Sequence, residues 1–326
     1  MKAFLLQNEQ GMQVTLLEYG ARVSSILFPV NGTLTEMTLG YRDNSQYLQD
    51  DFYLGASVGR VCNRIAQGQF ILNGTHYQLS QNSGAHCLHG GEIGFSQQYW
   101  QVDSESISAQ SIIFSLLSKE DDQGFPGELI VKIKYTLTDE NSLVIDFTGL
   151  ASATTLINLC NHCYFHLGDN SINDLALYIN ADDYLPIDNT GIPLGKPKPV
   201  AKSDFDFSKE TLVFDKLTNS TEQQIITNKG FDHCYVLSSN KNSDLKANAV
   251  LISRKSGVQL SVYTDQLGMQ LYTGQYLSGD FKPYQALCLE AQHFPDAINN
   301  PYLSSPIVET GKRYSKQVKY QFTLVR

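Results

Sequence analysis

A strict alternation of apolar and polar residues is the feature that most constrains how this chain can fold. The clearest run covers residues 129–137, where every second residue is apolar and most residues between them are polar. Similar runs occur at 143–147, 258–262 and 318–324. Because successive side chains of a strand point to opposite faces, a period of two predicts half-buried antiparallel strands. The chain is therefore expected to be all-β.

Asn-Gly pairs mark two expected hairpin turns. Asn73-Gly74 separates an apolar stretch at 70–72 from a second expected strand at 75–79, and Asn31-Gly32 has the same character. Two-residue Asn-Gly loops favour the primed turns that join antiparallel strands. The aromatic content of 11%, with 18 Tyr and 16 Phe, also suits strands.

The remaining segments give no reason to divide the chain. Residues 45–50 suggest one helical turn, 204–230 are expected to cross between sheets, and the polar stretch 238–248 reads as a loop. Since no Pro/Gly/Ser-rich linker or repeat interrupts the pattern, residues 1–326 are predicted to form one large, mainly antiparallel β domain.

Composition and charge exclude several classes of function. The net charge of −9 opposes binding to nucleic acid or to an anionic membrane surface. No segment approaches the roughly 20 apolar residues of a membrane span, and the apolar stretch at the N-terminus is too short for a signal peptide. The cytoplasm is therefore the expected location. Of the six cysteines, Cys160 and Cys163 form a lone C-x-x-C, so we expect reduced core residues.

Glu290 is the first candidate for chemistry. It follows the apolar run 287–289 and precedes a turn-like segment at 295–299. A carboxylate at the end of a buried strand is partly desolvated, which raises its pKa toward the range of a general base. The alternative is a strand-end glutamate that points into solvent, and position alone does not decide between the two.

Four further polar segments interrupt the strand pattern. They cover 59–66, 82–91, 158–168 and 230–235, and six of the seven histidines fall in or beside these segments or the Glu290 region. Metal binding is weakly supported because the histidines and acidic residues are scattered and form no H-E-x-x-H motif. There is no G-x-S-x-G elbow and no phosphate-binding loop. General acid/base chemistry by histidine and glutamate remains.

Taken in order, these segments resemble the aldose 1-epimerase (galactose mutarotase) family. The resemblance covers nearly the whole chain, and its six matching motifs keep the family's order and spacing. The motifs are Gly59-Arg60 with Asn63-Arg64, Leu88-His89-Gly90-Gly91, Asn161-His162 with Tyr164-Phe165, Phe231-Asp232-His233, Gln270 with Tyr272-Thr273-Gly274, and Leu289-Glu290 with Pro295-Asp296-Ala297-Ile298-Asn299.

The resemblance implies a large antiparallel β-sandwich of the galactose mutarotase-like (supersandwich) type. It implies an isomerase that interconverts the α and β anomers of free aldohexoses such as glucose and galactose, without cofactor or metal. In that reading His162 is the general acid, Glu290 is the general base, and His89 is a third catalytic group that donates to a sugar oxygen. The sugar-binding residues would be Asn63, Arg64, Tyr164, Asp232 and Gln270.

Two positions depart from the family's expected pattern, and two other functions stay open. Histidines stand at His86 and His166, where asparagine is expected, which affects local hydrogen bonding or sugar preference. One alternative is a non-catalytic sugar-binding module, which has no need of an acid/base pair. The other is a sugar-phosphate epimerase, whose phosphate clamp would rely on Arg60 and Arg64. The expected partner is a small free aldose, and the expected assembly is a monomer or homodimer.

Overall fold

We describe the chain from a computed structural model, in which the placement of residues 1–238 and 247–325 is described. Most of the expected loop at 238–248 lies outside these described residues. The strands of the described part form three larger antiparallel sheets and four two-stranded ribbons. No helix in these ranges is long and apolar enough to cross a membrane.

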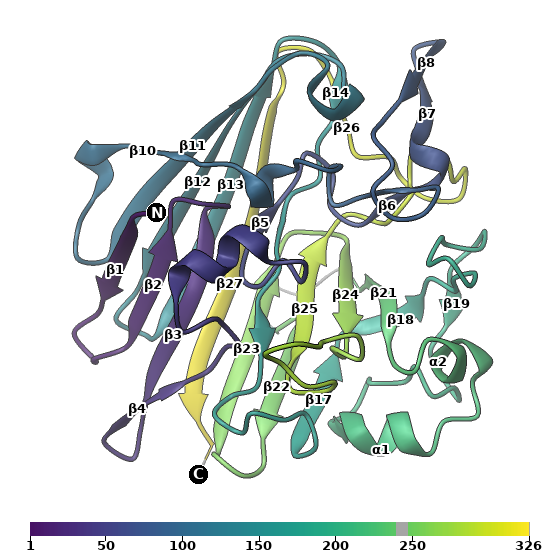
Figure 1. The fold of residues 1–326 in the computed structure, drawn as a ribbon. Helices are drawn as coiled ribbons and strands as arrows, with labels where there is room; N and C mark the ends of the chain where they lie inside the picture. Colours follow the sequence, from purple (N-terminus) through teal and green to yellow (C-terminus); the bar gives the residue numbers. More distant parts are fainter. Residues whose placement is uncertain (239–246, 326) are drawn as a thin grey trace.

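The largest sheet has nine strands among the described residues. This nine-stranded sheet forms the back layer in Figure 1. It contains the long alternating segments, because a strand with one apolar face needs a partner layer to cover that face. In spatial order its strands are β10 (Gln101–Val102), β11 (Ser111–Ser118), β12 (Leu129–Leu137), β13 (Ser142–Ala151), β27 (Arg313–Leu324), β23 (Val258–Thr264), β22 (Ala249–Ser253), β17 (Leu175–Ile179) and β20 (Thr211–Leu212).

The six-stranded sheet, again counted over the described residues, lies in front of the nine-stranded sheet (Figure 1). It presents the predicted site residues. Its strands in spatial order are β16 (Tyr164–Phe165), β25 (Leu287–Gln292), β24 (Gly268–Tyr272), β21 (Asp232–Leu237), β18 (Ala181–Tyr184) and β19 (Lys198–Pro199).

The four-stranded sheet, within the same described ranges, continues the front layer beside the six-stranded sheet. An isolated bridge between Thr38 and Phe165 joins the two. The four strands are β1 (Ala3–Gln7), β2 (Gln13–Leu17), β3 (Arg22–Val30) and β4 (Thr33–Glu36). The two-stranded ribbons pair β5 (Ser57–Val58) with β15 (Cys160–Asn161), β6 (Arg64–Ile65) with β9 (Cys87–Leu88), β7 (Gln69–Leu72) with β8 (Thr75–Gln78), and β14 (Thr155–Leu156) with β26 (Ile307–Val308).

Helices in the described chain are short and lie in the connections. The five 3₁₀ segments are η1 (Asn44–Gln49), η2 (Ala66–Gly68), η3 (Phe95–Gln97), η4 (Ser104–Ser106) and η5 (Asp122–Gly124), and the two α-helices are α1 (Val213–Thr218) and α2 (Gln223–Thr227). η1 confirms the helical turn expected near 45–50. The crossing expected at 204–230 is confirmed, since the chain passes from β19 to β20 and back to β21, but its two helices were not predicted.

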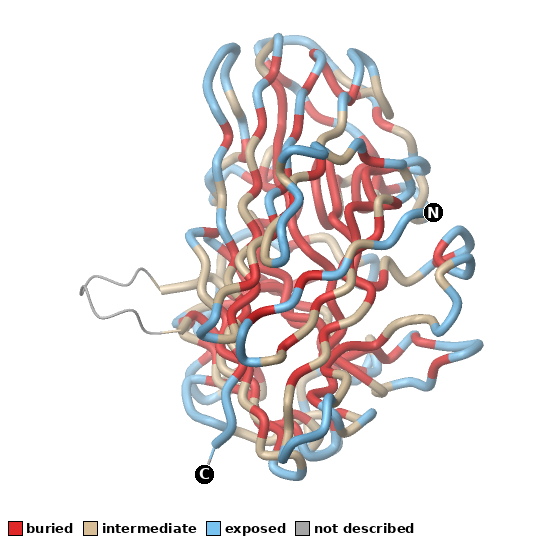
Figure 2. The backbone as a smooth tube through the Cα atoms, turned by 90° about the vertical axis from the view of Figure 1, so that its left-hand side faces the viewer, coloured by how far each residue is buried: buried red, intermediate tan, exposed pale blue. Residues whose placement is uncertain are grey.

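One large apolar cluster fills the space between the layers. It takes residues from all three larger sheets, such as Val14 of β2, Ile133 of β12 and Leu289 of β25. Figure 2 shows these buried segments running through the middle of the molecule, with exposed segments at the loops and edges. The fold is thus all-β and antiparallel, as the alternation predicted, and its layers form the β-sandwich that the resemblance implied.

The two Asn-Gly turns are confirmed. Asn31-Gly32 joins β3 to β4 and Asn73-Gly74 joins β7 to β8. All four residues have positive φ, between 49° and 80°, as a type I′ turn requires. The six cysteines are free and buried, which confirms the expectation of reduced core residues.

Candidate active site

Strand β25 places Glu290 in the site because its side chains point alternately to the two faces of the sheet. Leu289 and Ala291 face the apolar cluster, so Glu290 between them points to the opposite side of the six-stranded sheet. The strand continues to Gln292, which places Glu290 inside the strand. The expectation that Glu290 ends the strand was therefore wrong. The expectation of desolvation is confirmed, because Glu290 is 2% exposed.

Neighbouring strands place polar side chains on the same face. Gln270 of β24 lies directly opposite Glu290, and Asp232 of β21 lies opposite Tyr272 of β24. The Gln270 Nε2 group donates to Asp232 Oδ1 at 2.6 Å. On the other side of Asp232, Arg64 Nη1 lies 3.7 Å from Oδ2. Amide, carboxylate and guanidinium groups thus form one continuous row.

Two imidazoles meet the Glu290 carboxylate. His162 Nε2 lies 3.6 Å from Glu290 Oε1, and the rings of His89 and His162 are 5.2 Å apart. His89 Nδ1 accepts a hydrogen bond from the Asn63 backbone N–H at 3.2 Å, which leaves the proton of a neutral ring on Nε2. His162 Nδ1 contacts the Cys288 thiol at 3.6 Å. Both rings therefore have Nδ1 engaged by the protein.

The electrostatics of this group favour uncharged side chains. Burial raises the pKa of Glu290 to about 8, and the nearby negative charge of Asp232 adds to that rise. Burial lowers the pKa of His162 to about 4 and lowers that of His89 well below its ordinary value. Between these limits the Glu290–His162 pair holds one proton in total, and in the free protein that proton sits on Glu290.

The segment carrying Arg64 is held by the turn that follows β25. The Asp296 N–H donates to the Arg64 carbonyl at 2.9 Å, and the Asp296 carboxylate accepts from the Ala66 N–H at 2.9 Å. Above the guanidinium lies Gly191, where a Cβ would meet Arg64 Cζ at 2.8 Å. Arg64 Nε and Gln270 Oε1 are buried and lack a partner among the described residues.

The His89-Gly90-Gly91 turn has a steric explanation. A Cβ at Gly90 would lie 2.0 Å from the Gly59 carbonyl oxygen, and Gly90 has φ of +90°. Only glycine allows both the close approach and the left-handed backbone. The close packing of Gly90 on Gly59 places His89 beside Asn63, so the motif at 88–91 contacts the motif at 59–64.

The structure joins all of the predicted site residues in one cluster. Asn63 accepts the Arg64 N–H through its own Oδ1 at 2.9 Å, and the Tyr164 ring lies 5.1 Å from that of His162. Tyr164 is buried, and its hydroxyl donates to the Phe52 carbonyl. The arrangement can therefore offer a proton acceptor, a proton donor and several sugar-type hydrogen-bonding groups.

Sequence reasoning missed three neighbours of this cluster. The Tyr53 ring lies 4.6 Å from that of His89 and 5.8 Å from that of His162. The Cys160 thiol donates to Glu290 Oε2 at 3.6 Å. Cys288 shares the Glu290 face of β25, so the period-two rule alone was enough to place it. No sequence signal marks Tyr53, which comes from the loop after η1.

Other residues of the matching motifs have structural roles. Phe165 and Phe231 lie in the apolar cluster, so neither ring is free to stack on a sugar. Arg60 is 2% exposed and donates to the carbonyls of Ser118, Lys119, Pro126 and Gly127. The remaining site-region histidines, His86, His166, His233 and His293, each accept a backbone N–H at Nδ1.

Three residues of the cluster have the donor set of a metal site. The ligating atoms of His89, His162 and Glu290 all lie within 4.8 Å of one another. A tetrahedral zinc ion holds nitrogen and oxygen ligands at about 2.0–2.2 Å, which places them roughly 3.4 Å apart. The 3.6 Å between His162 and Glu290 is close to that spacing. The three could therefore hold a metal ion after a small adjustment.

Comparison with known sequences identifies a family. The model of the family described as Aldose 1-epimerase matches residues 2–321. An aldose 1-epimerase from Haemophilus influenzae is 38% identical over 97% of this chain and 94% of its own length. A galactose mutarotase from Sus scrofa is 35% identical over 99% of this chain and 94% of its own length.

Solved structures share the whole fold. The GalM/aldose epimerase homologue from C. elegans superimposes with a TM-score of 0.93 at 28% identity, covering 100% of this chain and 99% of that one. Galactose 1-epimerase from Lactobacillus acidophilus gives 0.89 at 29% identity over 99% and 95%. These likenesses confirm the sandwich type that the sequence resemblance implied.

Proposed function

The chain belongs to the aldose 1-epimerase family, and we propose that it interconverts the α and β anomers of free aldohexoses by acid/base catalysis at the His162–Glu290 pair. It is an isomerase. The observation that carries the mechanism is the 3.6 Å approach of His162 Nε2 to Glu290 Oε1 on a sheet face that also presents Asp232, Gln270 and Arg64.

Anomer exchange needs one proton to leave the sugar and another to enter it. Glu290 takes the proton of the O1 hydroxyl while protonated His162 gives a proton to the ring oxygen O5. The C1–O5 bond breaks, the aldehyde forms, and rotation about C1–C2 exposes its other face. Ring closure reverses both transfers and returns each side chain to its starting state, so the cycle consumes no co-reactant.

The free-protein protonation state must invert when the sugar enters. With a Glu290 pKa of about 8 and a His162 pKa of about 4, the shared proton begins on Glu290. Transfer across the 3.6 Å gap produces the Glu290 carboxylate and His162 imidazolium without changing the total charge. Asp232 acts on both groups, because its negative charge stabilises the His162 imidazolium and disfavours the Glu290 carboxylate.

The other cluster residues orient the sugar. Arg64 donates to sugar hydroxyls through its guanidinium, and Asp232, which Gln270 holds by a hydrogen bond, accepts from them. His89, with its proton on Nε2, donates to a ring or exocyclic oxygen. Asn63 contributes by fixing His89 and the Arg64 backbone, and Tyr164 flanks His162.

A phosphate-bearing substrate fits this site less well. Arg60, one of the two arginines available for a clamp, is buried against backbone carbonyls. Arg64, the other one, already faces the Asp232 carboxylate. A neutral aldose needs no clamp, so we favour the free sugar over a sugar phosphate.

We propose that residues 1–326 act as one aldose 1-epimerase domain in the galactose metabolism of the cytoplasm. The apolar cluster shared by the three sheets supports a single domain. Six free buried cysteines fit a reducing compartment, where disulfides are rare.

Polarimetry tests the proposed activity. Added to freshly dissolved α-D-glucose or α-D-galactose, the pure protein is expected to speed the approach to the equilibrium rotation in proportion to its concentration. A rate equal to that of buffer, with the sugar still bound, would instead establish a non-catalytic sugar-binding module.

A further inference from the structure

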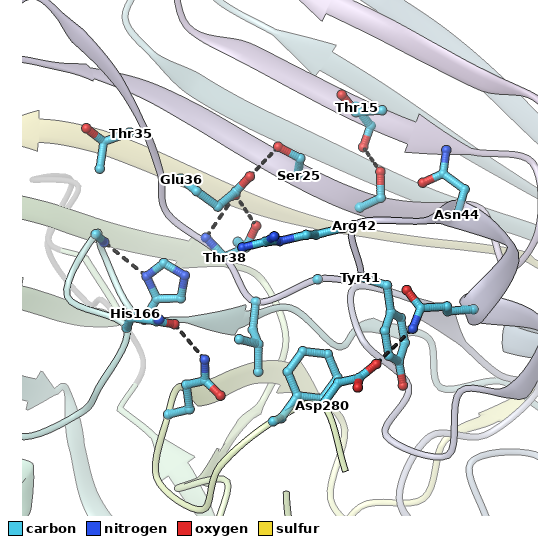
Figure 3. A pocket seen from close by; sticks show the side chains of 18 residues that line it. Thr15, Ser25, Thr35, Glu36, Thr38, Tyr41, Arg42, Asn44, His166 and Asp280 are labelled. Carbon is cyan, nitrogen blue, oxygen red and sulfur yellow. Dashed lines mark hydrogen bonds between the residues drawn. The ribbon is translucent and has the colours of Figure 1, made fainter. Parts of the chain in front are cut away.

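A second region of the molecule has the size and chemistry of a ligand site. A cavity of about 1000 Å³ lies between the four-stranded sheet and the loops that flank β16 and β25. We call it the Arg42 cavity, and Figure 3 shows its lining side chains. None of the predicted catalytic or sugar-binding residues lines it.

The lining combines planar polar groups with aromatic rings. Amide side chains come from Asn44, Gln46 and Gln285. The partly exposed ring of Tyr41 packs beside the buried ring of Phe281, with the ring centroids 4.9 Å apart. Gln46 and Gln285 already use both ends of their amides within the protein. The Asn44 amide keeps a donor and an acceptor in one plane, which matches adjacent hydroxyl groups on a sugar ring. Aromatic faces pack against the C–H faces of such rings. This is the chemistry that recognises a saccharide.

Cross-links between separate segments preorganise the walls. Gln46 Nε2 donates to Asp280 Oδ2 at 2.8 Å, joining η1 to the loop before β25. Gln285 Nε2 donates to Asn170 Oδ1 at 2.7 Å, joining that loop to the one after β16. Ligand sites gain affinity from such fixed geometry because little ordering is left for the binding step.

Glu36 forms a fixed polar wall. Its Oε1 accepts from the backbone N–H groups of Ile26 and Thr38 and from the Thr38 hydroxyl, and its Oε2 accepts from the Ser25 hydroxyl. Figure 3 shows the bonds from Ser25 and Thr38 converging on the carboxylate. The side chain is therefore held in place whether or not a ligand is present.

Two lining side chains have unused hydrogen-bonding groups. Arg42 extends across the view in Figure 3, and neither it nor Asn44 makes a side-chain hydrogen bond or ion pair with any described residue. The Arg42 guanidinium is not within ion-pairing distance of Glu36 or Asp280, although all three line the cavity. Its donors remain available to a ligand.

Charge and size narrow the class of ligand. The charged lining groups are one guanidinium and two carboxylates, and His166 is neutral because burial lowers its pKa to about 4. A net negative lining opposes phosphate and other anions. The volume is at the upper end of the roughly 300–1,000 Å³ typical of ligand pockets, which is more than one sugar ring needs.

We propose that the Arg42 cavity is a second saccharide site, which binds a neutral oligosaccharide of more than one ring independently of the catalytic cluster. It goes beyond the proposed anomer exchange, because recognition in this cavity requires no free anomeric carbon. Arg42 and Asn44 supply the unpaired polar contacts, and the partly exposed Tyr41 ring supplies the apolar face.

Non-reducing trisaccharides separate this site from the catalytic one. Raffinose, melezitose and methyl α-maltotrioside lack a free anomeric carbon, so none can be a substrate. Titration calorimetry of the full chain is expected to give saturable binding to at least one of them, with a Kd of roughly 0.1–5 mM. The Glu290→Gln variant is expected to bind it with the same affinity, so the result does not depend on catalysis.

Matched variants complete the test. The double variant Arg42→Ala/Asn44→Ala removes side chains without partners, so it should fold normally, keep its mutarotation rate and bind the trisaccharide about tenfold more weakly. Arg313→Ala, which removes an exposed arginine outside the cavity, should bind normally. Absence of saturable binding by all three sugars overturns the proposal. So does binding that is lost in Glu290→Gln, or binding that is unchanged in the double variant.

Discussion

Arg22–Asp50 and His162–Glu290 are both buried pairs of oppositely chargeable side chains, yet their surroundings differ. The side chains are 1% and 0% exposed in the first pair and 5% and 3% exposed in the second. The Arg22–Asp50 contact is 2.5 Å long, and the His162–Glu290 contact is 3.6 Å long. Burial alone therefore does not separate a structural pair from a reactive one.

The difference lies in the other hydrogen bonds. The Asp50 carboxylate also accepts from the N–H groups of Phe52 and Leu54, and Arg22 also donates to the carbonyls of Leu54 and Ser96. Among the described residues, the Glu290 carboxylate accepts only the long Cys160 thiol contact besides its approach to His162. A buried carboxylate with so few donors keeps its proton, which makes Glu290 the group whose charge can change during a reaction.

The largest expected effect is the loss of activity when Glu290 is replaced by a side chain that cannot change its charge. Glu290→Gln keeps the shape but removes the base, so kcat/KM for α-D-galactose should fall by about 10²–10⁴-fold. His162→Asn should give a loss of similar size by removing the acid. Polarimetry measures both, with exposed Glu309→Gln as the control. Rates near those of the unmodified protein in either site variant would refute the assigned roles.

Breaking the structural pair should instead cost stability. Arg22→Met leaves Asp50 charged and buried without its partner, which costs about 3–5 kcal/mol of unfolding free energy. Chemical denaturation measures the loss. The control is Arg254→Met, whose ion pair with Glu210 is about half exposed and should contribute roughly 0–1 kcal/mol. Equal losses in the two variants would show that the Arg22–Asp50 pair is not structural.

The activity should depend on pH as expected for a pair that shares one proton. Below about pH 4 His162 is protonated as well as Glu290, so the pair holds two protons. Above about pH 8 Glu290 loses its proton, so the pair holds none. The profile of kcat/KM should therefore be bell-shaped with limbs near these values. A profile that stays flat from pH 5 to pH 10 would contradict the shared-proton assignment.

The same pKa shifts set the sign of the stability change. The pKa of Glu290 is raised from 4.5 to about 8 in the folded protein, so its contribution is complete below pH 4.5 and lost as pH rises through about 8. His162 is shifted the opposite way, so its contribution is complete above pH 6.5 and lost as pH falls through about 4. Glu290→Gln should flatten the loss of stability between about pH 4.5 and pH 8, which denaturation at several pH values would show.

The sequence predicted the strands better than it predicted the site. The run at 129–137 matches β12 at both ends, because the alternation of a strand is a local property. Helices α1 and α2 contain six and five residues and have no side-chain cap, so tertiary contacts rather than local signals stabilise them.

The pairing of His162 with Glu290 could not be predicted from the periodicity of the sequence. His162 and Glu290 come from segments 128 residues apart, and they meet because β16 pairs with β25 just beyond His162. Only the family resemblance predicted that meeting. The Arg42 cavity had no sequence signal at all, since its walls come from five separate stretches of chain. Pattern rules describe neighbours along a strand and say little about which loops converge.

The smallest expected effect comes from giving Glu290 a better donor, which makes it more like Asp50. Cys160→Ser replaces the long thiol contact with a hydroxyl, which forms a shorter and stronger hydrogen bond to the charged carboxylate. The alkaline limb should move down by about one pH unit, equivalent to 1.36 kcal/mol. Cys160→Ala removes the donor and should move the limb up. Because the two variants shift the limb in opposite directions while leaving the site's other contacts intact, a general loss of structure cannot imitate the result. Shifts of the same sign in both variants would show that the number of donors to Glu290 does not set its pKa.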